Sequence, residues 1–246
     1  MTRRGEIFLT AHAGPDSRHA IRGGPFEEFL KWRPRPGEAV TVLDMNGVAW
    51  RARVLGLGKD FAEVLVFEKA PLPCVVELTV LQALPEKERM ELIIQKTTEL
   101  GVLRIVPFKS EKSISLCQRE SRQKKAHKWQ DAALRASRQC RSSFITEVSE
   151  YASFSDAIGL LKNKGLGLML LEKGDRTPVR QALEHAIRQG VRQVYMLCGP
   201  EAGFSAHEVK DAERAGFAPI SLGQRILRTE TASIVGAAII MHELCG

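Results

Sequence analysis

Apolar residues in the first 70 positions fall in short β-favouring runs, without helical spacing. Turn sequences such as Pro34-Arg35-Pro36-Gly37 and Met45-Asn46-Gly47 separate these runs. Short strands bounded by glycine- and proline-containing turns are typical of small all-β domains. The pattern therefore predicts a small β-barrel. Its predicted strands are Glu6–Leu9, Ala39–Leu43, Val48–Val54 and Ala62–Phe67.

The pattern changes after Pro71-Leu72-Pro73, and from residue 75 onward strand-like and helix-like segments alternate. In Lys87–Leu100 the apolar residues recur at helical spacing, and Gly101 follows where a C-terminal cap prefers glycine. Such alternation predicts a mainly parallel sheet with helices on both faces. We expect domains at residues 1–72 and 73–246. The other predicted elements are strands at 75–81, 103–106, 166–171, 193–198 and 218–222, and helices at 121–140, 178–189, 206–215 and 231–244.

Composition excludes several classes of protein. With 44% hydrophobic and 26% charged residues, the chain has the make-up of a folded protein. No apolar stretch approaches the roughly 20 residues that span a bilayer, and no apolar segment follows the first residues as in a secretory signal. The five cysteines form no C-x-x-C pair. We therefore expect a cytoplasmic protein with no membrane segment, no metal site and reduced cysteines.

The positive charge is concentrated in one segment. Lys109–Arg141 contains ten Lys or Arg and three acids, an excess that equals the formal net charge of +7. Basic side chains on a helix often face only solvent, but this concentration favours a phosphate-binding surface. Few Tyr and Trp are present for base stacking, which favours binding of folded RNA. The RNA-binding candidates here are Lys124, Lys125, Lys128, Arg135 and Arg138.

Two loops after predicted strands combine glycines with charged and apolar residues. The first is Gly199–Phe204, whose two glycines permit close backbone approach and positive φ. The second is Ser221–Ala232, in which Leu222, Ile226 and Leu227 are more apolar than an exposed loop requires. Parallel α/β sheets bind ligands beyond the carboxyl ends of their strands. The loops are therefore candidate ligand-binding segments, and the alternatives are a tight β-to-α connection and a capped helix start.

Taken together, the two loops resemble a known family. They run Gly-Pro-Glu-x-Gly-Phe-Ser and, further along the chain, Leu-Gly-x-Arg-Ile-Leu-Arg-Thr-Glu-Thr-Ala. This combination strongly resembles the RsmE family of 16S rRNA (uridine-N3) methyltransferases, which belong to the SPOUT superfamily. The resemblance extends to residues 96–102, to residues 107–113 and to the helix around Trp129. It covers most of the chain from about residue 75 to the end.

The resemblance implies an α/β fold with a SPOUT-type parallel sheet and a C-terminal trefoil knot, preceded by a small PUA-like β-barrel. The barrel's similarity lies in residues 29–32, 36–38 and 44–47, although Glu27, Glu28 and Lys31 stand where the family would have His and Arg. Lys31 and Arg33 are further RNA-binding candidates on the barrel. The family also implies a homodimer that uses S-adenosyl-L-methionine and no metal. Its implied activity is methylation of N3 of a uridine in 16S rRNA on the assembled small ribosomal subunit.

The chemistry of this reaction suggests roles for three residues. N3 of uracil carries a proton at neutral pH, so its methylation requires a proton acceptor and nearby positive charge. We expect Arg228 to stabilise the developing negative charge. Glu201 or Glu230 could accept the proton, orient Arg228 or bind the cofactor. The predicted cofactor-binding residues are Leu197, Gly199, Pro200, Gly203, Leu222, Gly223, Ile226 and Leu227.

Three positions of the second predicted domain depart from the family pattern. Ala202 replaces a glycine, Arg138 replaces a Glu and Ser142 replaces an Arg. The sequence therefore predicts methyl transfer more firmly than it identifies the methylated nucleotide. The alternatives are an RNA-binding or ribosome-assembly module that has lost catalysis, and a methyltransferase for another RNA nucleotide. A nicotinamide-dependent enzyme is disfavoured because no G-x-G-x-x-G follows an early strand.

Overall fold

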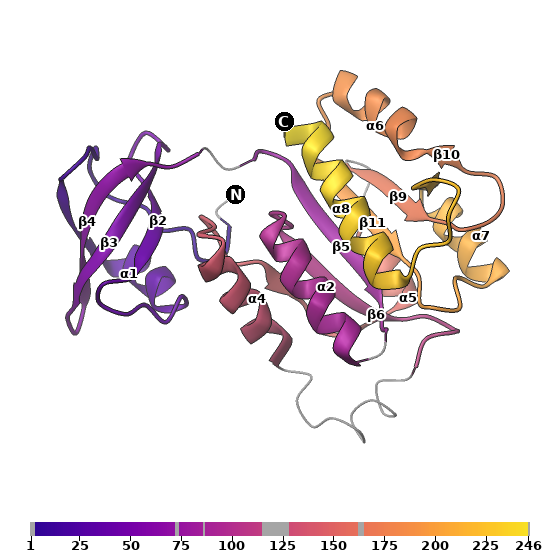
Figure 1. The fold of residues 1–246 in the computed structure, drawn as a ribbon, viewed down its shortest axis with the longest axis horizontal. Coiled ribbons are helices and arrows are strands. Elements are labelled where there is room, and N and C mark those ends of the chain that lie inside the picture. Colours follow the sequence, from indigo (N-terminus) through magenta and orange to yellow (C-terminus); the bar gives the residue numbers. More distant parts are fainter. Residues whose placement is uncertain (1–2, 72–73, 86, 115–127, 162–164, 246) are drawn as a thin grey trace. The chain divides into compact units, whose positions relative to one another are not determined.

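The computed structural model describes residues 3–71, 74–85, 87–114, 128–161 and 165–245 (Figure 1). The chain divides into two compact units. One comprises Met1–Cys74 and Ala133–Thr146, and the other comprises Val75–Ala132 and Glu147–Gly246.

The first unit is built on a four-stranded antiparallel sheet with the order β1-β4-β3-β2. Of the predicted strands, Glu6–Leu9 is wrong, because Phe8 forms only an isolated bridge to Leu43. The strand β1, in contrast, was not predicted, since its sequence Arg-His-Ala-Ile-Arg contains few apolar residues. The elements are β1 (Arg18–Arg22), α1 (Gly23–Leu30), β2 (Ala39–Leu43), β3 (Ala49–Leu57) and β4 (Phe61–Lys69).

The predicted turn at Met45-Asn46-Gly47 forms around a buried carboxylate. Asp44 is 3% exposed and accepts hydrogen bonds from the backbone N–H groups of Asn46 (2.9 Å) and Val48 (3.0 Å). Burial favours the neutral acid, but these hydrogen bonds hold the pKa of Asp44 below its ordinary value. Gly47 has φ 74°, a conformation that glycine adopts without steric cost. The turn therefore fixes the register of β2 and β3.

The second unit contains a parallel sheet with the order β10-β12-β9-β11-β5-β6-β7, and β8 also pairs with β6. Every pairing in this sheet is parallel, as the alternation of strands and helices predicted. The strands are β5 (Glu77–Ala83), β6 (Arg104–Lys109), β7 (Glu147–Val148), β8 (Ala152–Ser153), β9 (Leu166–Leu170), β10 (Thr177–Pro178), β11 (Gln193–Cys198) and β12 (Phe217–Ser221).

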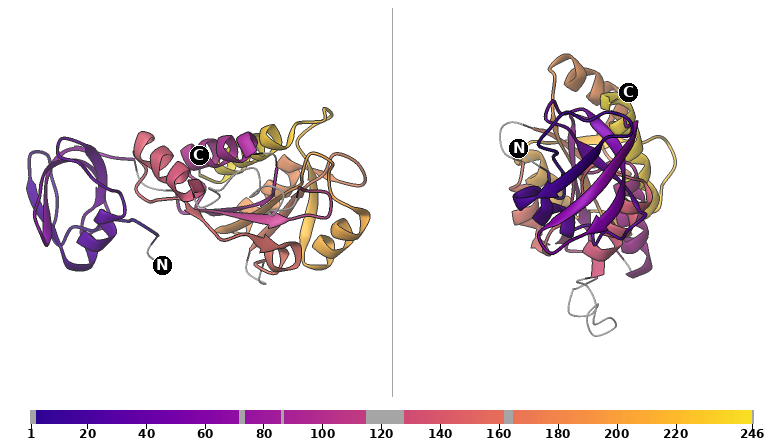
Figure 2. Two further views of the ribbon diagram at one scale, coloured as in Figure 1. Left: turned by 90° about the horizontal axis from the view of Figure 1, so that it is seen from below. Right: turned by 90° about the vertical axis from the view of Figure 1, so that its left-hand side faces the viewer.

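Helices cover both faces of the parallel sheet (Figure 2). In the left view of that figure, α2 and α8 lie along one face and α5 and α7 along the other. Gly236 lets α8 approach the sheet closely, because a Cβ at this position would lie 2.7 Å from Met196 Sδ. The helices of the second unit are α2 (Lys87–Glu99), α5 (Phe154–Ile158), α6 (Val179–Arg188), α7 (Ala206–Arg214) and α8 (Thr229–Cys245).

The basic helix predicted at residues 121–140 is described only in part. Helix α4 runs from Trp129 to Gln139, and residues 115–127 lie outside the described ranges. The cysteine prediction is wrong for two residues, since Cys74 and Cys245 are disulfide-bonded. Of the described cysteines, Cys140 and Cys198 are free. Within the described ranges, no helix is both long enough and apolar enough to span a membrane.

Candidate active site

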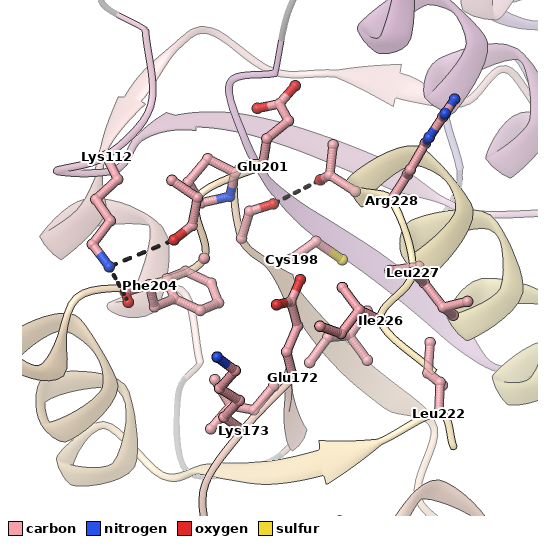
Figure 3. A pocket seen from close by; sticks show the side chains of 18 of the residues that line it. Lys112, Glu172, Lys173, Cys198, Glu201, Phe204, Leu222, Ile226, Leu227 and Arg228 are labelled. Carbon is pink, nitrogen blue, oxygen red and sulfur yellow. Dashed lines mark hydrogen bonds between the residues drawn. The ribbon is translucent and has the colours of Figure 1, made fainter. Parts of the chain in front are cut away.

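A cavity of about 560 Å³ lies at the carboxyl ends of β9, β11 and β12 (Figure 3). Its volume falls in the range of small-molecule binding pockets. Three chain segments supply most of its lining. These segments are Leu170–Lys173, Cys198–Phe204 and Leu222–Thr229 without Gln224, and Arg89, Lys112, Val209, Ile220 and Ala232 complete the lining.

The loop after β11 owes its shape to its glycines. Gly203 has φ 66° and donates its N–H to the carbonyl oxygen of Pro200 (2.9 Å), which closes a tight turn. No heavy atom lies within 4 Å of the position that a Cβ of Gly203 would occupy. The described non-glycine residues with positive φ do not include Ala202. The replacement of the family's glycine by Ala202 therefore causes no backbone strain at this position.

Two contacts connect this loop with the segment after β6. Lys112 Nζ donates a hydrogen bond to the carbonyl oxygen of Phe204 (3.0 Å). The buried carboxylate of Glu208, in the first turn of α7, accepts the backbone N–H groups of Glu111 (3.0 Å) and Ser205 (2.9 Å). Ser205 in turn caps α7 through its hydroxyl, which accepts the N–H of Glu208. The buried carboxylate of Glu208 thus stabilises this wall of the cavity through the hydrogen bonds that it accepts.

The loop between β12 and α8 presents apolar side chains to the cavity. Leu222, Ile226 and Leu227 all line it, and the side chain of Ile226 is exposed (68%). Gly223 has φ 130°, and its N–H donates to Ser221 Oγ (3.1 Å). An exposed isoleucine at a cavity rim offers apolar area that a flat ligand can cover. The loop therefore suits a ligand with an aromatic ring.

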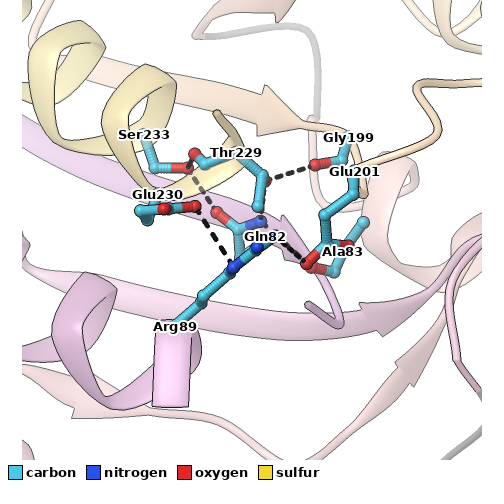
Figure 4. Close-up of polar contacts among 8 residues, drawn as sticks. All are labelled: Gln82, Ala83, Arg89, Gly199, Glu201, Thr229, Glu230 and Ser233. Atoms are coloured by element: carbon cyan, nitrogen blue, oxygen red, sulfur yellow. Dashed lines mark hydrogen bonds and ion pairs between the residues drawn. The ribbon is translucent and has the colours of Figure 1, made fainter. Parts of the chain in front are cut away.

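A buried hydrogen-bond network fixes the start of α8 against the loop after β11 (Figure 4). Thr229 Oγ1 donates to the carbonyl oxygen of Gly199 (2.7 Å). The fully buried Gln82 donates to Thr229 Oγ1 (3.3 Å) and accepts a hydrogen bond from Ser233 Oγ. Cys198 is also fully buried, and this burial raises the pKa of its thiol to about 12. The thiol is therefore neutral and serves packing rather than nucleophilic chemistry.

Arg89 of α2 reaches both carboxylates that the sequence analysis considered as proton acceptors (Figure 4). Its Nη1 donates to Glu201 Oε1 (2.9 Å), and its Nε lies 3.8 Å from Glu230 Oε2. Arg89 and Glu201 line the cavity, whereas Glu230 does not. Glu230 is the more buried of the two carboxylates, with a side chain 13% exposed against 34% for Glu201.

The structure brings most of the predicted ligand-binding residues to one cavity. Of the eight predicted cofactor-binding residues, only Leu197 does not line it, because its side chain is fully buried in the core beside α5 and α7. Arg228 and Glu201 line the cavity, and Arg228 is exposed. Sequence reasoning missed Arg89, Gln82 and Lys112. Their positions depend on pairings between distant segments, although Arg89 lies in a helix that the spacing predicted.

The predicted RNA-binding residues have differing surroundings. Lys31 forms an ion pair with Glu28, and Arg138 forms one with Glu38 in which Arg138 Nε donates at 2.9 Å. Arg33, Lys128 and Arg135 are exposed. Lys124 and Lys125 lie outside the described residues. Within the parts of the chain that are described, no group of three or more His, Cys, Asp or Glu is arranged to bind a metal.

A parallel sheet whose glycine-containing loops line a cavity of about 560 Å³ defines an α/β protein with a candidate ligand site at the carboxyl ends of its strands. The model of a family described as an RNA methyltransferase domain matches residues 71–241. Ribosomal RNA small subunit methyltransferase E of Synechocystis is 30% identical over 211 residues, which cover 85% of this chain and 67% of the relative. The chain belongs to this family, the RsmE family of ribosomal RNA methyltransferases.

Other relatives agree with this assignment. The enzyme of the same name from Bacillus subtilis is 24% identical over 86% of this chain and 84% of its own length. A crystal structure of the Neisseria gonorrhoeae enzyme of the same name, bound to S-adenosyl methionine, has a TM-score of 0.64. It is 25% identical and covers 96% of each chain. A probable rRNA-methyltransferase from Porphyromonas gingivalis gives a TM-score of 0.63 at 25% identity, over 97% of this chain and 98% of the other.

Proposed function

We propose that this protein uses S-adenosylmethionine to methylate N3 of a uridine in 16S rRNA within the small ribosomal subunit. The observation that carries the proposal is the cavity, because Arg228 and Glu201 line it together with two glycine-containing loops and the apolar side chains of Leu222, Ile226 and Leu227. Family membership and the relative bound to S-adenosyl methionine support the choice of cofactor. The resemblance of the two loops supports the nucleotide, as set out above.

The residues of the cavity fit this cofactor. Leu222, Ile226 and Leu227 offer apolar contacts for adenine, and the backbone at Gly203 is open to close approach, because no heavy atom lies within 4 Å of the position that its Cβ would occupy. The cofactor supplies an electrophilic methyl group bonded to a sulfonium. Transfer forms a bond from N3 to the methyl carbon, and the bond from sulfur to that carbon breaks with its electrons returning to sulfur. N3 must lose its proton for this step.

We assign two residues of the chain to that proton loss. Arg228 interacts with the uracil carbonyl oxygens as negative charge develops on the ring. Glu201 accepts the N3 proton, because it lines the cavity whereas Glu230 does not. Arg89 is a positioning residue, since its hydrogen bond to Glu201 Oε1 fixes the orientation of that carboxylate.

Further properties belong to the same proposal. We propose that the segments around the cavity form a trefoil knot, that the first unit is a PUA-like barrel that binds RNA, and that the protein acts as a homodimer in the cytoplasm. The apolar side chain of Leu92 on α2, which is 41% exposed, supports an interface with a second copy at this helix. The antiparallel sheet of the first unit supports the barrel assignment.

The function is tested by supplying the purified protein with S-adenosylmethionine and small ribosomal subunits from a strain that lacks this methyltransferase. We expect one added methyl group at a single uridine of 16S rRNA, located by mass spectrometry of nuclease fragments. Methylation of a different nucleotide would overturn the proposed target. Binding of subunits without any methyl transfer would instead support the non-catalytic RNA-binding alternative.

The loop conformation gives a prediction for cofactor binding. Gly203→Val should raise the Kd for S-adenosylmethionine roughly tenfold to hundredfold, because a β-branched residue at φ 66° is strained. Gly203→Asn is the matched control, since Asn is similar in size to Val but tolerates this conformation. Calorimetry should therefore show near-normal affinity for Gly203→Asn. Equal affinities for both variants would show that the conformation of Gly203 does not matter for binding.

A further inference from the structure

A group of arginines on the first unit has no role in the function derived above. Arg51 and Arg53 are two residues apart on β3, so their side chains leave the same face of the strand. Arg141, just after α4, belongs to the same unit. Its carbonyl oxygen accepts hydrogen bonds from Arg51 Nη1 and from Thr41 Oγ1 (2.9 Å). The three arginines therefore form one group beside β2 and β3, called the β3 arginine group below.

The β3 arginine group differs from four other basic residues of this unit, which are paired with carboxylates. Carboxylates pair with Arg18, Arg22, Lys31 and Arg138. Among the described residues, no carboxylate forms an ion pair with any member of the β3 arginine group. Glu68 lies opposite Arg51 in the β3–β4 register and acts on it only through its longer-range field. Excess positive charge is therefore concentrated at this place.

The structure holds these like charges together. Burial and the neighbouring Arg141 charge lower the pKa of Arg51 below its ordinary value, and the field of Glu68 offsets this only in part. Arg141 also adopts φ 55°, which is uncommon for a non-glycine residue. Its carbonyl oxygen is fixed in this conformation by Arg51 and Thr41. Close like charges and an unusual backbone conformation are features that mark functional sites.

The donors of the group suit a phosphate. Only Nη1 of Arg51 is used in the hydrogen bonds to Thr41 and Arg141, and a guanidinium carries five N–H donors in a planar fork. The guanidinium of Arg53 lies over the Phe67 ring (5.8 Å to the centroid) and donates one bond to the Gly37 carbonyl oxygen (3.3 Å). Fixed guanidinium groups with unused donors bind phosphate oxygens with geometric specificity.

We propose that Arg51, Arg53 and Arg141 form a binding site for backbone phosphates of RNA. The inference rests on the proposed function, which makes a folded ribosomal RNA the substrate. It replaces Lys31 and Arg138 as the RNA contacts of this unit, because each of those residues is already paired with a carboxylate. The site contacts phosphates rather than bases and so positions the RNA without selecting its sequence.

The test measures how RNA affinity depends on salt. The double variant Arg53→Gln/Arg141→Gln leaves Arg51 in place, because Arg51 hydrogen-bonds to Thr41 and to the Arg141 backbone. Loss of two phosphate contacts should reduce the slope of log affinity against log salt by about 1.4 to 1.8. Between about 50 and 200 mM salt, the variant should therefore lose roughly tenfold less affinity than the wild type. The RNA probes are 16S rRNA and an unrelated RNA duplex, each measured by filter binding.

A charge-matched control separates this site from a general loss of positive charge. Arg18→Gln/Arg22→Gln removes the same charge from β1 of the same sheet, where both arginines are ion-paired. This control should keep the wild-type slope. Equal slopes for the wild type and Arg53→Gln/Arg141→Gln would overturn the proposal, as would an equal reduction in both double variants. S-adenosylmethionine affinity, measured by calorimetry, should be the same in all three proteins.

The two RNA probes also distinguish this inference from the proposed function. If the slope falls as expected on the RNA duplex but no 16S rRNA is methylated, the phosphate site stands and the proposed activity is wrong. If 16S rRNA is methylated normally and the slope does not change on either probe, the activity stands and the phosphate site is wrong. Methylation by Arg53→Gln/Arg141→Gln should show a raised KM for RNA with unchanged kcat.

Discussion

Arg228→Ala should lower kcat for methyl transfer by about 10² to 10³, the effect of losing one donor aimed at developing negative charge. The structure supports this residue over two of the other cations that line the cavity. Arg89 is hydrogen-bonded to Glu201, and Lys112 donates to the Phe204 carbonyl oxygen. Within the described ranges, no carboxylate forms an ion pair with Arg228, and it directly precedes α8. Its guanidinium is therefore available to the substrate.

Two further variants test whether catalysis depends on the position of the positive charge or only on its presence in the loop. Arg225→Ala removes the same charge from the same loop, and we expect a much smaller loss of kcat. Arg228→Lys keeps the charge but loses the planar fork, so it should recover only part of the activity. Cofactor affinity, measured by calorimetry, should barely change in Arg228→Ala. If Arg228→Ala and Arg225→Ala lose activity equally, the specific role of Arg228 is wrong.

The sequence predicted the second unit better than the first because its elements carry strong local signals. Periodic apolar positions in residues 87–100 and the glycine after them specify α2 without reference to the rest of the chain. Strand β1 carries no comparable signal, since it is held by pairing with β4 and only its Ile21 is buried. Tertiary pairing can thus stabilise a strand that local sequence does not indicate.

The candidate site shows the same difference between residues with a local sequence signal and residues placed by tertiary contacts. Loop residues such as Gly203 and Leu222 could be predicted because the two loops together carry sequence motifs that resemble those of a known family. Arg89 and Gln82 could not, because nothing near them in sequence shows that α2 and β5 meet the loop after β11. The pairing of Arg138 with Glu38 joins positions one hundred residues apart, and it offers a structural reason for the departure at Arg138.

Glu201→Gln should lower kcat by about 10² to 10⁴, the typical contribution of a positioned proton acceptor. Gln keeps the size of the side chain and can still accept a hydrogen bond from Arg89, so the loop should keep its shape. Glu230→Gln is the matched control, because it changes the other carboxylate near Arg89 at a position outside the cavity. It should cost much less activity.

The dependence of kcat on pH provides a readout that a purely structural role would not change. As pH rises, a growing fraction of the uracil loses its N3 proton to solvent, so an internal acceptor becomes less important. The deficit of Glu201→Gln relative to wild type should therefore shrink at high pH, whereas a deficit caused by a disordered loop should not. Single-turnover rates with small ribosomal subunits across the pH range measure this directly. A larger deficit in Glu230→Gln, decreasing at high pH in the same way, would identify Glu230 as the proton acceptor and overturn the assignment of Glu201.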